Sequence, residues 1–292
     1  MSVEVRQQFD LPGATARFRF SAHSDRGSVR KVNEDSFLTA APYFAVADGM
    51  GGHAHGDRAS QAAIAAFADL PGGSPARAQD VLDTIARAND AVLGLTDGTG
   101  DGALSGTTLT GIALVNVVGD ETCHWMAFNI GDSRTYSWDG RTLAQLSVDH
   151  SAVQELVDLG RLTRQEAEHH PYRNVVTRAL GADDEVEADI WLIPARARQT
   201  FLLCSDGLTK ELADDEIARI IVFHDAEAQR ESDGLPLTLA ERLVRAAVAA
   251  GGSDNVTVVV VEFELVGDDT NIDDTLERGR LPGVLEDTRP RS

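Results

Sequence analysis

The sequence predicts a layered α+β sandwich built on antiparallel β-sheets. Segments with strand-like character follow one another in blocks, and pairs of helical segments interrupt these blocks. The order of the two types lacks the regular alternation of a parallel βαβ fold. With 292 residues the chain can bury a substantial core, in one large domain or two small ones.

The first part of the chain is predicted to form strands and then two helices. Alternating or continuous apolar patterns predict strands at 16–24, 36–40 and 43–47. Alanine-rich stretches predict helices at 60–70 and 76–95, and the Pro- and Gly-rich residues 71–75 form the loop between them.

The second part is richer in strands and closes with two helices. Strands are expected at 107–118, 122–130, 133–138, 187–193, 199–205 and 255–265, with a hairpin turn at Asp139 and Gly140. Helices are expected at 214–222 and 239–250. The second helix has Thr238 as its N-cap and Glu241 three residues later, which together form a capping box.

Two segments are exceptions to this regular pattern. Residues 151–180 are polar and rich in charge and histidine, which predicts helical pieces and loop, a flap at about 151–181. Beyond Gly267 apolar residues become scarce, so we expect a folded domain over 1–266 and a disordered acidic tail over 267–292.

Composition restricts the possible partners and the compartment. The formal net charge of −21 repels nucleic acids and anionic membranes. No apolar run approaches the roughly 18 residues of a membrane span, and the N-terminus lacks a secretory signal pattern. Cys123 and Cys204 lie far apart, which argues against a disulfide framework, and Cys204 is expected to be buried. We therefore expect a cytoplasmic protein, monomeric, with no nucleic acid or membrane partner.

Aspartates lie at the ends of apolar strand segments. Asp48, Asp132 and Asp206 each follow such a segment, and Asp254 precedes another. If these strands share one sheet or two stacked sheets, their carboxylates can converge. Buried carboxylates without a partner are costly, and a bound cation removes that cost. All-oxygen ligation suits Mg²⁺ or Mn²⁺ better than zinc or copper. The alternative reading, in which each Asp-Gly pair only forms a turn, fits one such pair better than it fits all of them.

A second signal precedes the strand at 36–40. Basic and acidic residues are mixed over 24–35, and they include Arg30, Glu34 and Asp35. Arginine is suited to gripping two phosphate oxygens, and the two carboxylates could hold metal-bound waters. A solvated charged loop explains the same composition, so the spacing alone does not decide between these readings.

An ordered set of motifs resembles the PPM, or type-2C, metal-dependent protein phosphatases in their bacterial form. The matching motifs span 18–263 and are Ser24-Asp25-Arg26-Gly27 through Arg30, Asn33-Glu34-Asp35, Ala47-Asp48-Gly49-Met50-Gly51-Gly52-His53, Ser105-Gly106-Thr107-Thr108, Asn129-Ile130-Gly131-Asp132-Ser133-Arg134, Asp149-His150-Ser151, Cys204-Ser205-Asp206-Gly207-Leu208 and Gly252-Ser253-Asp254-Asn255. The resemblance implies a four-layer α-β-β-α sandwich with two central antiparallel sheets between helix layers.

The resemblance also implies a role for each motif residue. Asp48 would bridge two cations, Mn²⁺ or Mg²⁺, with the Gly49 carbonyl on one ion and Asp206 and Asp254 on the other. Asp132, with Asp206, matches a third metal position. Arg30 matches the phosphate-binding arginine, and Glu34 and Asp35 match ligands of metal-bound water. Asn255 resembles a residue that supports the metal ligands without touching the metal, or one that forms a turn.

These roles imply a serine/threonine phosphatase that hydrolyses phosphoserine and phosphothreonine by attack of a metal-bridging water. Met50 stands where some relatives carry a histidine proposed as general acid, and His53 is only a weak substitute. By resemblance the partner is a bacterial serine/threonine kinase or its phosphoprotein targets. The alternatives are an inactive pseudophosphatase that binds phosphoproteins and another metal-dependent phosphoesterase such as a nuclease.

Overall fold

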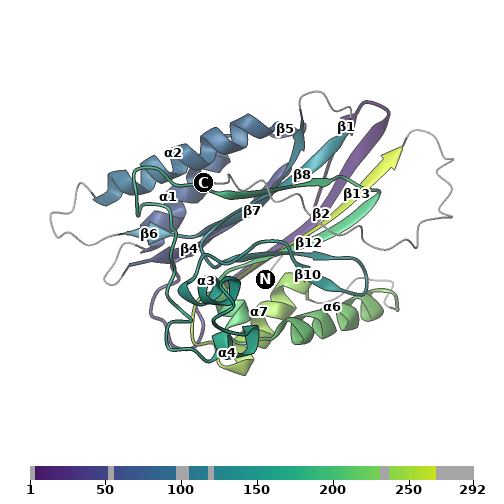
Figure 1. Cartoon of the computed structure of the whole chain (residues 1–292). Coiled ribbons are helices and arrows are strands. Elements are labelled where there is room, and N and C mark those ends of the chain that lie inside the picture. The colour runs from purple at the N-terminus through teal and green to yellow at the C-terminus, as the bar shows by residue number, and fades with distance from the viewer. Residues whose placement is uncertain (1–3, 52–55, 97–104, 118–121, 231–236, 268–292) are drawn as a thin grey trace.

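The computed structural model describes residues 4–51, 56–96, 105–117, 122–230 and 237–267. Two β-sheets lie face to face in the middle of the molecule, and helices cover the outer face of each sheet (Figure 1). The predicted α-β-β-α sandwich is therefore confirmed. The expected tail lies outside the described residues, apart from Gly267, which ends the last strand.

One sheet has the strand order β1-β2-β13-β12-β9-β10, and the other has the order β11-β8-β7-β4-β3, with β5 beside β7 and β6 beside β4. Every pairing among the described strands is antiparallel except the short one between β5 and β7. The strands are β1 Val5–Leu11, β2 Ala14–Asp25, β3 Asp35–Ala40, β4 Tyr43–Met50, β5 Ala76–Arg77, β6 Gly106–Thr107, β7 Leu109–Asn116, β8 Cys123–Ile130, β9 Arg134–Trp138, β10 Leu143–Gln145, β11 Asp189–Pro194, β12 Arg198–Cys204 and β13 Val256–Gly267.

The helices form two outer pairs, a smaller pair, α3 and α4, and the single short helix α5. Helices α1 and α2 cover the sheet that contains β4 and β7, whereas α6 and α7 cover the sheet that contains β12 and β13 (Figure 1). None of the described helices is long and apolar enough to cross a membrane. The helices are α1 Gly56–Ala68, α2 Ala78–Thr96, α3 Ala152–Asp158, α4 Arg164–Glu168, α5 Asp206–Thr209, α6 Asp214–Ala228 and α7 Leu239–Ala250.

The central strands are apolar throughout because both of their faces are buried. In β12, Phe201 and Leu203 point into the core between the sheets, while Leu202 and Cys204 pack under α6 and α7. Side chains alternate between the two faces of a strand, so a strand covered on both sides needs apolar residues at every position. The predicted burial of Cys204 is confirmed.

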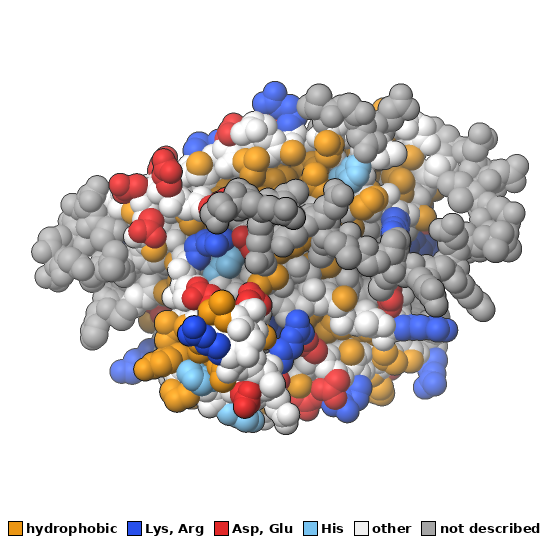
Figure 2. All heavy atoms as spheres, viewed as in Figure 1, with side chains coloured by type: hydrophobic (Ala, Val, Ile, Leu, Met, Phe, Trp, Pro, Cys, Tyr) orange, Lys and Arg blue, Asp and Glu red, His pale blue; other side chains and the backbone are white. Residues whose placement is uncertain are grey.

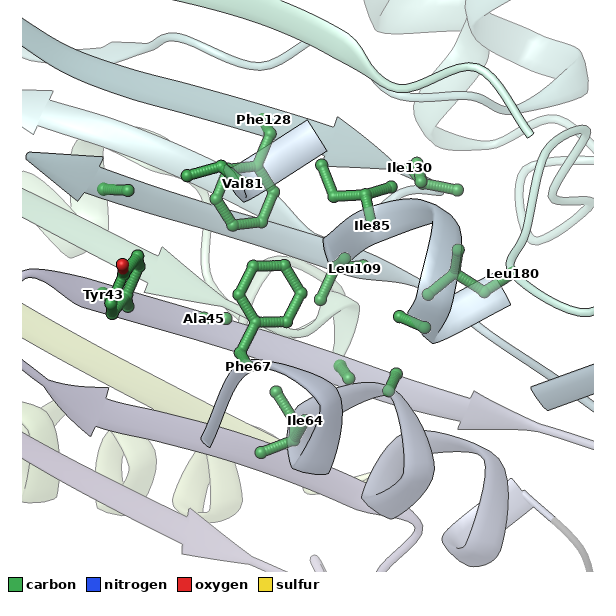
Figure 3. Packing of buried hydrophobic residues seen from close by; sticks show 14 of the residues in the cluster. Tyr43, Ala45, Ile64, Phe67, Val81, Ile85, Leu109, Phe128, Ile130 and Leu180 are labelled. Atoms are coloured by element: carbon green, nitrogen blue, oxygen red, sulfur yellow. The ribbon is translucent and has the colours of Figure 1, made fainter. Parts of the chain in front are cut away.

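The core under α1 and α2 continues into the segment expected to be a flap. Phe67 of α1 stacks on Phe128 of β8 with ring centroids 5.5 Å apart, and Ile85 of α2 lies beside them (Figure 3). Leu180, near the end of that segment, is buried in the same cluster. Its backbone exchanges two hydrogen bonds with Thr107, of 2.9 and 3.1 Å. The C-terminal end of the segment is therefore anchored next to β4.

Several elements differ from the sequence expectation. Strand β1 was not predicted, because four of its seven residues are polar and only Phe9 is buried. Helix α6 extends to Ala228, six residues beyond the expected end at 222. Asp48 and Gly49 do not form a turn: β4 continues through Met50, with Asp48 opposite Asp35 of β3.

Candidate metal centre

The predicted site residues converge where strand ends of the two sheets meet. Asp35 and Asp48 face each other on β3 and β4 of one sheet. Ser205, which follows β12 of the other sheet, donates a hydrogen bond of 2.8 Å from its Oγ to Asp35 Oδ2. The next residue, Asp206, begins α5, and its charge acts on both Asp35 and Asp48. Residues far apart in the sequence thus form one acidic cluster.

Asp48 is held through its own backbone. Its N–H donates to Thr108 Oγ1 at 3.0 Å, and its carbonyl accepts from the Thr108 N–H at 2.9 Å. The neighbouring Gly49 donates to the Glu34 carbonyl at 3.1 Å. A Cβ on Gly49 would lie 2.0 Å from the Gly56 carbonyl oxygen, so only glycine allows this approach.

The loop before β3 is fastened by Asn255. Its Oδ1 accepts from the Glu34 N–H at 2.8 Å, and its Nδ2 donates to the carbonyls of Arg26 at 3.0 Å and Val32 at 2.9 Å. The same loop passes closely over Asp254, because a Cβ on Gly27 would lie 2.1 Å from the Asp254 carbonyl oxygen. Gly27 also has a φ of 74°, which favours glycine. Asn255 therefore acts as a clamp on the segment that carries Arg30 and Glu34.

Cations surround one side of the acidic cluster. Arg30 binds Asp254 with Nε 2.8 Å from Oδ1 and Nη2 2.9 Å from Oδ2. Lys210 places its Nζ 2.7 Å from Asp254 Oδ2 and 2.5 Å from Asp206 Oδ2. Lys210 directly follows α5, one helical turn after Asp206. Among the described residues, the side chains of Asp35, Asp48 and Asp132 form no ion pair with a cation.

Asp132 comes from the turn that connects β8 of one sheet with β9 of the other. It is 8% exposed and lies close enough for the charges of Asp206 and Lys210 to affect it. The following Arg134 forms a bidentate ion pair with Asp149, with Nη2 2.6 Å from Oδ2 and Nε 2.9 Å from Oδ1. Arg134 therefore neutralises Asp149 and supports the turn that carries Asp132.

The strand-end carboxylates are strongly perturbed. Burial, together with the charge of Asp206, raises the pKa of Asp35 to about 7 and that of Asp132 to about 7. Burial and three neighbouring aspartates raise the pKa of Asp48 well above its ordinary value, and burial also raises the pKa of Asp206. Burial alone would raise the pKa of Asp254 too, but the hydrogen bond and charge of Lys210, with Arg30, hold it below its ordinary value. Crowded carboxylates of this kind are stabilised by an added cation.

The chemistry of these residues fits a hard divalent cation. Asp35 Oδ1 and Asp206 Oδ1 are buried and have no hydrogen-bond partner in the structure. Such orphaned oxygens are rare in folded proteins and point to an unfilled ligand position. The donor set is all oxygen, as Mn²⁺ and Mg²⁺ prefer. Within the described ranges, however, no group of three or more His, Cys, Asp or Glu side chains is arranged so that it could hold a metal ion. The predicted ligands lie near one another but do not form such a group.

A second polar network ties the expected flap to the Asp132 turn. The Gly131 N–H donates to His150 Nδ1 at 3.0 Å, so Nε2 carries the hydrogen in the neutral ring and faces Asp189 Oδ2 at 3.3 Å. Arg178 of the flap also binds Asp189, at 2.8 Å. Although burial opposes it, the hydrogen bonds from His150 and Arg178 lower the pKa of Asp189 to about 2. As predicted, the segment expected to be a flap contains short helical pieces, α3 and α4, joined by loop.

Some functional candidates were missed or cannot be placed. Lys210 and Ser205 had no predicted role, although Lys210 is one of only two lysines in the chain and stands four residues after Asp206. Met50 is the last residue of β4, where it pairs with Gly106. His53 lies outside the described residues.

Carboxylates and an arginine thus converge at the strand ends of a four-layer sandwich. The family model of protein phosphatase 2C matches residues 22–244, so the chain belongs to the protein phosphatase 2C family. The family and fold expected from the motifs are thereby confirmed.

Named relatives agree with this assignment. Over 254 residues the chain is 41% identical to the serine/threonine protein phosphatase PstP of Mycobacterium tuberculosis, covering 85% of this chain but 45% of PstP. It is 32% identical to the serine/threonine phosphatase stp of Listeria monocytogenes, covering 83% of this chain and 94% of stp. A crystal structure of the catalytic domain of PstP with two manganese ions is 37% identical and superposes with a TM-score of 0.69, covering 86% of this chain and 99% of that one. The chain thus spans about half the length of PstP.

Proposed function

We propose that this chain is a divalent-metal-dependent phosphatase that hydrolyses phosphoserine and phosphothreonine in proteins. The observation that carries the proposal is the pair of buried, partnerless oxygens on Asp35 and Asp206, within the electrostatic reach of Asp48. This possible cation-binding position lies near the Arg30 guanidinium, which can bind a phosphate. The two features together match what phosphate-ester hydrolysis requires.

The predicted residues have the following proposed roles. Asp48, the Gly49 carbonyl, Asp206 and Asp254 hold two divalent cations, Mn²⁺ or Mg²⁺, and Asp132 with Asp206 offers a third position. Glu34 and Asp35 bind through water. Support for Asp35 comes from its geometry, because Ser205 holds one carboxylate oxygen and leaves the other free.

Bound divalent cations would supply an activated water and neutralise charge on the transferred phosphoryl group. The protein's own residues orient the substrate. Arg30 uses the Nε and Nη2 donors for Asp254 and keeps Nη1 available for a phosphate oxygen. Cys204 is not a candidate nucleophile. Burial raises the pKa of its thiol and keeps the thiol protonated. The overall reaction converts a phosphoester and water into an alcohol and inorganic phosphate.

The remaining features of the function are inferred from the family. The catalytic unit spans 1–266 with the flap at about 151–181, and 267–292 form an acidic tail. The enzyme acts in the cytoplasm as a monomer, in signalling, and reverses a serine/threonine kinase. On the face shown in Figure 2 acidic and basic side chains are interspersed, which suits protein substrates better than a nucleic acid backbone.

A direct assay tests this function. The full chain should hydrolyse p-nitrophenyl phosphate and a phosphothreonine peptide with Mn²⁺, and EDTA should abolish both activities. In a single turnover in H₂¹⁸O, one ¹⁸O should enter the inorganic phosphate. Metal binding without turnover would indicate a pseudophosphatase, and preferential cleavage of DNA would indicate a nuclease. A trapped covalent phosphoenzyme would contradict direct hydrolysis.

A further inference from the structure

The acidic cluster is divided into two parts that differ in charge compensation. Asp254 uses both carboxylate oxygens in bonds to Arg30 and Lys210, and Asp206 uses one oxygen for Lys210. In contrast, Asp35, Asp48 and Asp132 form no ion pair among the described residues. Basic side chains therefore compensate only the part of the cluster formed by Asp206 and Asp254.

Lys210 is placed by the fold to bridge these two carboxylates. It follows α5, so it lies on the same side of the helix as Asp206, four residues earlier. Asp254 approaches from the loop between α7 and β13, where the Gly27 and Gly252 backbones pack closely together. The side chain of Lys210 is only 25% exposed, so the ammonium exchanges much of its hydration for the two carboxylates. Removing either the ammonium or a carboxylate would leave a partly buried charge without its partner, which destabilises the fold.

The ammonium and a divalent cation compete for these two carboxylates. Lys210 Nζ lies 2.5 Å from Asp206 Oδ2 and 2.7 Å from Asp254 Oδ2, which are distances of direct contact. A cation that is coordinated by both carboxylates would come within a few ångströms of the ammonium, and the two positive charges would repel strongly.

We propose that Lys210 is a tethered counter-cation of the metal centre. It holds Asp206 and Asp254 together in the metal-free protein and leaves them when they take a divalent cation. Lys210 therefore stabilises the metal-free fold and weakens metal binding at this half of the site. This inference rests on the proposed metal-binding role of Asp206 and Asp254.

The chain offers an unusually simple test, because it contains only two lysines. Lys31 is exposed and serves as an internal reference for Lys210. The full chain is treated with a trace of acetic anhydride at constant pH, in EDTA or in saturating Mg²⁺, and peptide mass spectrometry gives the ratio of Lys210 to Lys31 acetylation. We expect a low ratio in EDTA and a rise of about tenfold in Mg²⁺, as for the loss of one partly buried ion pair. A ratio that is unchanged or lower in Mg²⁺ would overturn the proposal.

A substitution provides a second readout that does not depend on activity. Lys210→Met keeps the unbranched shape of the side chain, one atom shorter, and removes the charge, and Lys31→Met removes the same charge from an exposed position. By calorimetric titration, Lys210→Met should bind Mn²⁺ about tenfold more tightly than wild type, whereas Lys31→Met should differ by less than about twofold. In EDTA, Lys210→Met should melt at a lower temperature than wild type, and saturating Mn²⁺ should remove this difference.

The outcomes distinguish failure of the proposed metal centre from failure of the proposed role of Lys210. If wild type binds no Mn²⁺, the proposed metal centre itself fails and the role of Lys210 fails with it. If wild type binds Mn²⁺ and Lys210→Met binds it equally or less tightly, only the counter-cation role is overturned. An increase in KM for p-nitrophenyl phosphate in Lys210→Met, with unchanged Mn²⁺ affinity, would assign Lys210 to the substrate instead.

Discussion

Asp206 lies between a cation and the other carboxylates of the site. One of its oxygens binds Lys210 and the other is buried without a partner. It is also close enough to Asp35, Asp48 and Asp132 for its charge to raise the pKa of each. A carboxylate in this environment indicates a ligand-binding role rather than a stabilising one.

Asp206→Asn should abolish metal-dependent activity while the fold survives. The substitution keeps the side-chain shape but removes the negative charge that a cation needs, so kcat/KM should fall by more than about 100-fold. Without metal, the melting temperature should change little, because relief of the crowding among the aspartates is offset by loss of the ion pair with Lys210. Phosphatase assays and melting curves in EDTA check both effects. Asp215→Asn, an exposed residue paired with Arg219, is the control. Near-wild-type turnover by Asp206→Asn would show that its carboxylate is not a ligand.

Arg30→Ala should weaken phosphate binding more than it slows turnover. Charge-assisted hydrogen bonds are worth about 1.5–3 kcal/mol, which corresponds to a rise in KM for p-nitrophenyl phosphate of about 10- to 100-fold. Initial-rate kinetics at saturating Mn²⁺ measure this rise. Arg6→Ala on the exposed edge strand β1 should leave KM unchanged. If Arg30→Ala has the KM of wild type, Arg30 only neutralises Asp254.

At the scale of elements, the site depends on a loop that makes few apolar contacts of its own. The segment between β2 and β3 carries exposed Val29 and Val32, and the clamp by Asn255 fixes its backbone. Because Asn255 directly precedes β13, the central strand of its sheet positions the loop. A rigid strand thereby determines where Arg30 and Glu34 lie.

Asn255→Ala should therefore affect both stability and substrate binding. It leaves the Glu34 N–H and the carbonyls of Arg26 and Val32 without their partner, at a cost of about 1–3 kcal/mol. Urea unfolding in EDTA should detect this loss, and KM should rise because the Arg30 loop is no longer fixed. Asn116→Ala, at an exposed position at the end of β7, serves as the matched control. Equal stability of the two variants would argue against the clamp.

The elements also show what sequence patterns can predict. Strands buried on both faces, such as β12 and β13, produce long apolar runs, and the aspartates at their ends were found for that reason. Edge strand β1 buries only Phe9 and gives no such pattern. Lys210 was missed because its second partner, Asp254, is 44 residues away in the sequence, so their contact depends on tertiary structure. The sequence alone did not show that Asp48 lies opposite Asp35. That pairing follows from the register of β3 and β4.

At the scale of the whole molecule, the acidic cluster makes the stability of the metal-free protein depend on pH. The pKa values of Asp35 and Asp132 are raised to about 7, from about 4 in an unfolded chain. Between these values the folded state binds more protons than the unfolded state. The contribution of both groups to stability is therefore complete below pH about 4 and is lost as the pH rises to about 7. Asp189 has the opposite shift, to about 2, but its contribution changes only below pH about 4.

The melting temperature in EDTA should therefore fall between pH 5 and pH 7 more steeply in wild type than in Asp35→Asn, which lacks one of the buried titrating carboxylates. Saturating Mn²⁺ should remove most of the difference in slope, since a cation takes over the compensation that protons provide. Because protons and metal compete for the same oxygens, Mn²⁺ affinity measured by calorimetry should rise over the same pH range. Parallel melting profiles for wild type and Asp35→Asn in EDTA would show that Asp35 is not the buried, proton-binding carboxylate that the fold creates. A flat Mn²⁺ affinity across this range would show that the cations bind away from the strand-end carboxylates.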